Sequence, residues 1–228
     1  QSNTCLENSI AISKTNLLMG FVSDSKNQID TKVLVSCGKP VSSVDVNILK
    51  FDEELILQPD QIGEIVIRSD FLFTEYWANP IATSNAFTSN GYFRTGDSGF
   101  MRDGELFVTG RLKDIIIIQG KNLHSSDVEL ALTDVAGLVP GRVAAVGLLD
   151  DSIGTERLVI LAETDIESTE LKKKIVNAIR LKIKSEFDVA ASIVKLLPPK
   201  WLIKSTSGKM ARNENREKLV LLMNKTNV

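Results

Sequence analysis

Four consecutive isoleucines, Ile115–Ile118, constrain the fold of this chain more than any other short stretch. A short β-branched run bounded by charges and a glycine is typical of a buried strand. Its entrance carries Arg111, Lys113 and Asp114. These charges indicate either an ordinary solvated strand end or a joint beside a ligand site, and the sequence on both sides bears on that choice.

The residues before 111 carry the pattern of a β-rich unit. Asp103 and Gly104 can supply the positive φ values of a tight turn, so we expect a hairpin there. Short β-branched stretches, separated by Gly, Pro and polar residues, predict strands within residues 31–38, 44–51 and 63–69. Residues 1–30 are polar and weakly periodic. The Asn-Pro dipeptide at 79–80 is expected to end any regular element, and residues 82–87 are expected to form one or two helical turns.

The residues after 118 alternate between helix and strand patterns. Apolar side chains recur every four residues from Leu171 to Phe187, which predicts a helix with one buried stripe that includes Ile175, Ile179 and Ile183. The other expected elements are buried strands within residues 142–150 and 157–164, another strand within 191–199 and a closing helix at 214–223.

The stretch that follows the isoleucines predicts a turn at residues 120–122 and then a helix through 127–135. Ser125 or Ser126 can cap this helix, and Asp127 and Glu129 are favourably placed in its first turn. His124 is the only histidine, and we expect it to face solvent or to take part in the cap.

The change of pattern at residue 111 predicts an α+β protein of two domains rather than one continuous fold. The expected domains are a β-rich unit at residues 1–110 and a small α+β unit at 111–228.

Composition excludes several classes of protein. The 228 residues carry a net charge of −2, which argues against a protein that mainly binds the nucleic-acid backbone. We expect no membrane span, because no apolar run approaches the roughly 20 residues that a bilayer requires. Two cysteines and one histidine make neither a disulfide framework nor a metal cluster, so a reduced, cytoplasmic setting is expected. The chain opens without Met, so we expect a fragment of a longer protein.

Three stretches could carry chemistry. Asp97 is either a turn-former or a carboxylate that accepts hydrogen bonds from a vicinal diol such as a ribose. Arg111 lies fourteen residues beyond Asp97, across the expected hairpin. It is either a surface charge or the cation of the same ligand site. Lys209, in a loop made flexible by Gly208, is either an exposed charge or an ammonium group that stabilises a transition state.

Taken in order, these stretches resemble the adenylate-forming superfamily of acyl-CoA synthetases, fatty acyl-AMP ligases, luciferases and peptide-synthetase adenylation domains. The motifs are GEIVIRS, EYWANP, GYFRTGDSGF, GELFVTGRLKDIII and STSGK, and the resemblance covers about residues 32–215. LVSCGKPV, LKDIIIIQGKN and GTERLVIL are most similar to the fatty acyl-AMP ligase branch, in which residues 1–31 would belong to an inserted segment. Leu123-His124-Ser125-Ser126 and Ile203 depart from the superfamily's usual pattern.

The resemblance implies a role for each candidate residue. Asp97 would bind the ribose hydroxyls of ATP and of the acyl-adenylate, and Arg111 would contact the ribose and phosphate side. Lys113 would be the hinge of a mobile C-terminal lid. Lys209 would bridge the acyl carboxylate and the α-phosphate. Mg²⁺ is implied as well, with its ligands expected upstream of this chain.

The resemblance also implies an activity. The chain would be the distorted, barrel-like last subdomain and the lid of an ATP-dependent ligase that activates a fatty acid as acyl-AMP. The acceptor would be the phosphopantetheine arm of an acyl carrier protein. The alternatives are an acyl-CoA synthetase and a non-catalytic docking module. Because the superfamily's phosphate loop is not found in this sequence, the fragment alone is expected to be inactive.

Overall fold

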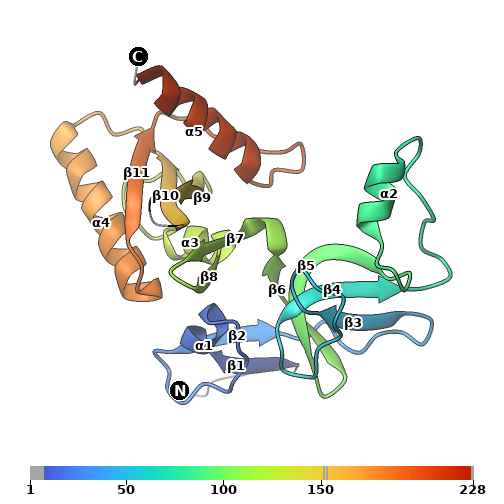
Figure 1. Ribbon diagram of the computed structural model, residues 1–228. Helices are drawn as coiled ribbons and strands as arrows, with labels where there is room; N and C mark the ends of the chain where they lie inside the picture. The colour runs from blue at the N-terminus through green and yellow to red at the C-terminus, as the bar shows by residue number, and fades with distance from the viewer. Residues whose placement is uncertain (1–7, 151, 153, 227–228) are drawn as a thin grey trace. The chain divides into compact units, whose positions relative to one another are not determined.

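The computed structural model describes residues 8–150, 152 and 154–226 (Figure 1). The chain divides into two compact units, residues 1–113 and 114–228. This division falls three residues after the boundary expected from the sequence. The identity of the units as a subdomain and a mobile lid stays a prediction.

The first unit is built mainly from antiparallel strands. Strands β3, β4, β5 and β6 form one sheet in that order, and β1 pairs with β2. The elements are β1 (Ser9–Ser13), α1 (Lys14–Leu18), β2 (Thr31–Val35), β3 (Asp45–Leu49), β4 (Gly63–Arg68), α2 (Pro80–Ala86), β5 (Phe93–Arg102), β6 (Glu105–Arg111) and the 3₁₀ turn η1 (Leu112–Asp114). Over the described residues this sheet is open and does not form a closed barrel. The mixture of helices and separate sheets in the chain confirms the α+β class.

The core of the first unit joins the β1–β2 pair to the β5–β6 hairpin. Phe100 and Phe107 stack at a ring-centroid distance of 5.2 Å, and they form one apolar cluster with Ile12, Leu17 and Leu34. The weak periodicity of residues 1–30 did not predict the strand at residues 9–13. Ile12 is fully buried and its strand gains backbone partners from β2, which local sequence does not reveal.

Two turns of the first unit depend on particular residues. In the β5–β6 hairpin, Asp103 and Gly104 have φ values of 53° and 79°, as expected for a two-residue turn. Asn79-Pro80 does not end an element, because it begins α2. The Asn79 side chain accepts a hydrogen bond from the Ala82 amide at 3.0 Å, and proline is well suited to the first helical position.

The second unit contains a three-stranded sheet and a separate hairpin. The order of the sheet is β11-β10-β9, in which β10 and β11 are parallel and are joined by α4, and β9 and β10 are antiparallel. The elements are β7 (Ile115–Ile118), β8 (Lys121–His124), α3 (Ser125–Ala131), β9 (Val143–Asp150), β10 (Thr155–Glu163), α4 (Thr169–Phe187), β11 (Ala191–Leu197) and α5 (Arg212–Thr226).

The predicted stripe of α4 is confirmed for its central residues. Ile175, Ile179 and Ile183 are buried. Leu171, in the first turn, is 45% exposed and lines an open groove beside Ile166, so the apolar stripe is not buried along its whole length. The hydrophobic stripe therefore covers less of the helix than the four-residue repeat suggested.

The stretch after the isoleucines differs from its prediction. The turn is made by Gln119 and Gly120, at φ 51° and 79°, and residues 121–124 continue as a strand. His124 lies at the N-cap position of α3 without a side-chain cap bond, and it is buried rather than solvent-facing. Ser125 does not cap the helix, because its hydroxyl donates to the Asp114 carbonyl at 2.9 Å.

Within the described residues, no helix has both the length and the apolar character needed to cross a bilayer.

Candidate functional site

Asp97 and Arg111 lie opposite each other across the β5–β6 hairpin. The two-residue turn sets the register as far as Gly99 and Val108, and an irregularity between Ser98 and Gly99 then shifts it by one residue. Asp97 therefore pairs with Arg111, and the arginine Nε lies 3.3 Å from the aspartate Oδ1. Both side chains reach solvent, the aspartate at 36% and the arginine at 66% exposure. An anion and a cation are thus held side by side on an accessible strand end.

The backbone around Asp97 is fixed by its neighbour Thr95. The Thr95 hydroxyl donates to the Ile65 carbonyl at 2.7 Å and accepts from the Asp97 amide at 3.1 Å. Gly96, between them, has a φ of 71°, a value that L side chains rarely adopt. This short segment therefore orients the carboxylate through contacts with the sheet interior.

Lys113 is exposed and lies in the 3₁₀ turn between β6 and β7. It is the last residue of the first unit. Asp114, the next residue, is tied to the second unit by its carbonyl and its carboxylate.

Lys209 lies in an exposed loop of the second unit. The Ser205 amide donates to the Lys209 carbonyl at 2.8 Å, and the Ser205 hydroxyl accepts from the Lys209 amide at 3.2 Å. Gly208 closes the turn at φ 80°. The backbone of the loop is therefore ordered by its own hydrogen bonds, while the lysine stem extends into solvent.

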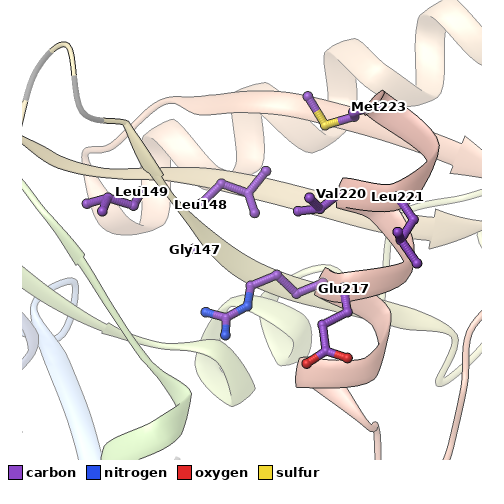
Figure 2. Close-up of a pocket in the computed structure, with 8 residues that line it drawn as sticks. Gly147, Leu148, Leu149, Glu217, Val220, Leu221 and Met223 are labelled. Atoms are coloured by element: carbon purple, nitrogen blue, oxygen red, sulfur yellow. The ribbon is translucent and has the colours of Figure 1, made fainter. Parts of the chain in front are cut away.

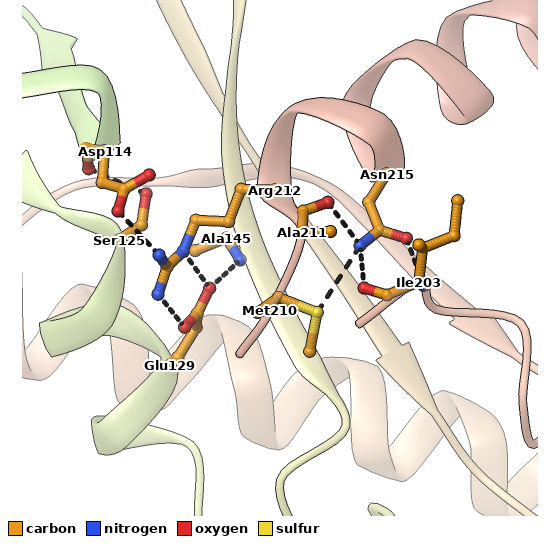
Figure 3. A network of polar contacts seen from close by, with 9 residues as sticks. All are labelled: Asp114, Ser125, Glu129, Ala145, Ile203, Met210, Ala211, Arg212 and Asn215. Carbon is orange, nitrogen blue, oxygen red and sulfur yellow. Dashed lines mark hydrogen bonds and ion pairs between the residues drawn. The ribbon is translucent and has the colours of Figure 1, made fainter. Parts of the chain in front are cut away.

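Two buried polar side chains hold the segments that flank this loop. The Glu163 carboxylate, 1% exposed, accepts from the Lys200 and Leu202 amides at 2.9 and 2.6 Å. Asn215, in α5, accepts from the Ile203 amide and donates to the Ile203 carbonyl, both at 2.9 Å (Figure 3). These contacts fix where the lysine loop leaves the core.

Sequence reasoning missed Arg212, whose guanidinium contacts two carboxylates (Figure 3). Its Nε and Nη2 donate to Glu129 at 2.8 and 2.6 Å, and its Nη1 donates to Asp114 at 2.8 Å. Burial acts to lower the pKa of Arg212, but the hydrogen bonds and negative charges of Glu129 and Asp114 outweigh it and raise that pKa above its ordinary value.

An apolar groove of about 640 Å³ lies between β9 and α5 (Figure 2). Leu148, Leu149, Val220 and Leu221 line it, together with Arg216 and Glu217. None of the candidate residues lines this groove, so it is separate from the candidate site.

No cluster of three or more His, Cys, Asp or Glu side chains suited to a metal ion occurs in the part of the chain that the structure describes.

Known proteins resemble this chain in sequence and in fold, although no protein-family model matches it. It is 32% identical over 208 residues to the medium-chain-fatty-acid–[acyl-carrier-protein] ligase JamA of Moorena producens (strain JHB), covering 87% of this chain and 35% of that protein. It is 32% identical over 196 residues to the putative fatty-acid–CoA ligase fadD21 of Mycobacterium leprae (strain TN), covering 78% and 33%. A structure from work on fatty acyl-adenylate ligases of E. coli and L. pneumophila matches with a TM-score of 0.81 at 25% identity, covering 96% of this chain and 38% of that chain.

Over most of its length the chain is thus similar to part of proteins named as fatty-acid ligases and fatty acyl-adenylate ligases. The chain belongs to the adenylate-forming superfamily. It spans about a third of the length of the curated relatives it matches, so the activity, substrates and partners of the whole protein are proposals.

Proposed function

We propose that the chain is part of an ATP-dependent ligase that activates a fatty acid as acyl-adenylate and transfers it to an acyl carrier protein. The observation that carries the proposal is the cross-strand pair of Asp97 and Arg111, in a chain that also presents Lys209 on a braced loop. An anion for hydroxyl groups and cations for phosphate are the groups that a nucleotide requires.

Asp97 is proposed to bind the ribose of ATP and of the adenylate. One carboxylate oxygen lies beside Arg111, which leaves the other oxygen and the remaining lone pairs for a pair of hydroxyl donors. Arg111, which is more exposed than its partner, would contact the ribose and phosphate side of the same nucleotide.

Lys209 is proposed to act at the reacting atoms. When an acyl carboxylate oxygen attacks the α-phosphorus, a P–O bond forms and the bond to the leaving pyrophosphate breaks. Two negative groups are forced together in that step, and a positioned ammonium group stabilises the charge that develops. The exposed lysine side chain on an ordered loop backbone supports this role.

Mg²⁺, expected with ATP, finds no cluster of ligands in the described part of the chain. Its ligands are proposed to lie in residues outside this chain, and no step is assigned to a metal.

The acceptor is proposed from the names of the relatives. JamA is named as a ligase to an acyl carrier protein, which supports phosphopantetheine as the acceptor, and fadD21 is named as a putative CoA ligase, which supports CoA as the alternative. The cytoplasm, where ATP and acyl carriers meet, is the proposed compartment.

A product assay on the whole ligase tests this function. The enzyme is supplied with ATP, Mg²⁺ and fatty acids of several lengths, and then with a phosphopantetheine-bearing carrier protein or with CoA. Pyrophosphate release and acyl-AMP without an acceptor, followed by acyl transfer to the carrier, is the expected result. Rapid formation of acyl-CoA would establish the alternative, and formation of no adenylate with any acid would leave only the docking module.

A further inference from the structure

The guanidinium of Arg212 links three parts of the second unit (Figure 3). Arg212 is the first residue of α5 and follows Lys209 by three positions. Its paired bonds to Glu129 attach it to α3, and its bond to Asp114 attaches it to the first residue of the unit. We call these three side chains the Arg212 clamp.

Each acidic residue of the Arg212 clamp also makes a second contact, Asp114 through its backbone carbonyl and Glu129 through its carboxylate. The Asp114 carbonyl accepts from Ser125, at the start of α3. The Glu129 Oε1 accepts from the Ala145 amide of β9 at 3.1 Å. The clamp side chains are only 15–25% exposed, and a buried ion pair that loses one partner leaves an uncompensated charge. The clamp therefore holds its backbone segments firmly.

The clamp fixes one end of the lysine loop, and Asn215 fixes the other. The Asn215 side chain hydrogen-bonds to the amide and the carbonyl of Ile203, before the loop. The loop joins α5 at Arg212, which is held by its own side chain. The same guanidinium holds Asp114, so the backbone immediately after Lys113 belongs rigidly to the second unit. Free rotation at the joint is then confined to the residues before Asp114.

We infer that Arg212 is a positioning residue, which makes the Lys209 loop and the joint at Asp114 parts of one rigid body. Any rotation at Lys113 then moves Lys209 through the same rotation, because no flexible segment separates the joint from the loop. This inference rests on the proposed function only for the role of Lys209, because the clamp itself is a property of the described chain. Arginine suits it because its planar fork can hold two carboxylates at once, which the single ammonium group of lysine does less well.

Backbone ¹⁵N relaxation on this chain tests the clamp without any assay of activity. In Arg212→Gln, order parameters at Asp114 and at residues 205–209 should both fall, from about 0.85 towards about 0.6. Arg212→Lys should lie between Arg212→Gln and the unchanged chain. Arg216→Gln, exposed and one turn further along α5, is the control and should alter neither segment. A fall in only one segment, or in neither, overturns the inference.

If Arg212→Gln does not fold, Asp114→Asn replaces it, because this change removes one arm of the clamp and leaves the Arg212–Glu129 pair. The joint should then lose order and the loop should lose less. An unchanged joint in Asp114→Asn overturns the inference.

A double-mutant cycle in the whole ligase separates positioning from a merely structural role. Arg212→Gln should lower kcat for adenylation about 10-fold or more, because a displacement of about 1 Å is costly at a reacting group, with KM for ATP changed less than about 2-fold. In a Lys209→Ala background the same change should cost less than about 2-fold, because the group being positioned is gone. Equal losses in both backgrounds would show that Arg212 does not act through Lys209. If the unchanged ligase forms no acyl-AMP, the proposed function fails, and the relaxation result still decides the clamp.

Discussion

Asp97, Arg111 and Lys209 carry different parts of the proposed chemistry, and substitution should separate them. In the whole ligase, Lys209→Ala should lower kcat for adenylation by a factor on the order of 10² or more, because a charge that acts in the transition state is lost. The affinity for ATP should change little. Stopped-flow or pyrophosphate-exchange rates measure this, and Lys173→Ala, another exposed lysine of the same unit, is the control.

Arg111→Ala should weaken the binding of ATP as well as lower the rate, because its contact with the nucleotide exists before and during the reaction. Equilibrium binding of ATP, compared with kcat/KM, checks this. Arg180→Ala, at an exposed position of α4, is the control. A variant of Arg111 that binds ATP normally would contradict the assignment and would favour a plain surface ion pair with Asp97.

The sequence predicts one half of the candidate site better than the other. The two-residue turn places Asp97 and Arg111 near each other on facing strands, as local rules predict, but their direct pairing depends on a one-residue register shift between Ser98 and Gly99. The Arg212 clamp joins residues that are 83 and 98 positions apart, and no local rule links them. Two sequence signals for Arg212 were available: it lies close to Lys209, and it begins a helix. Both signals are weak.

The buried stripe of α4 should dominate the stability of the second unit. Ile179→Ala removes a fully buried side chain and should lower the free energy of unfolding by about 2–5 kcal/mol. Leu181→Ala, at 72% exposure on the same helix, should change it by less than about 0.5 kcal/mol. Urea unfolding followed by circular dichroism measures both, and similar losses would mean that α4 packs on another face.

The end of α4 should respond to acid. Asp188 ends the helix at φ 51°, and its carboxylate accepts from Lys184 at 2.6 Å and from Lys121 at 3.1 Å. These hydrogen bonds, with that from Lys184 the larger, and the two positive charges lower the pKa of Asp188 from 3.8 to about 2. Because the pKa is lower in the folded state, the stabilisation is complete above pH about 4 and is lost as the pH falls towards 2.

An NMR titration of the Asp188 carboxyl should give a midpoint near 2, and Lys184→Gln should raise it towards 3.8. Lys173 is an exposed lysine near the other end of the same helix, so Lys173→Gln should leave the midpoint unchanged. Asp188→Asn should flatten the pH dependence of stability between pH 4 and 2. A wild-type midpoint near 3.8 would show that neither lysine holds the carboxylate in solution.

Element by element, periodic patterns predict the fold well where one face is buried. The stripe of α4 and the strands β9, β10 and β11 follow from such patterns. The strands that the sequence did not predict are β1 and β8. Strand β1 is defined by pairing with β2, and β8 continues directly from the turn at Gln119 and Gly120 into a short polar strand. β8 carries too few apolar residues to signal a strand, and β1, although its three central residues are apolar, is only five residues long.

The 228-residue chain should be unable to form an adenylate by itself. The candidate residues lie in two units of one chain that covers about a third of its curated relatives. The superfamily's phosphate loop, by resemblance, belongs to residues outside this sequence. ATP–pyrophosphate exchange by the 228-residue chain should therefore stay at background, and the whole ligase is the positive control. Exchange by the chain alone would refute the proposal that adenylation requires residues outside this sequence.

The two tryptophans give each unit its own optical reporter. Trp77 is 94% exposed in the first unit, whereas the Trp201 ring, in the second, is partly buried beneath the Lys218 ammonium group at 4.0 Å from the ring centroid. Their emission should differ in wavelength and in quenching by acrylamide, because only one indole is fully hydrated. Single-tryptophan variants, Trp77→Phe and Trp201→Phe, would therefore let the melting of each unit be followed separately in one polypeptide.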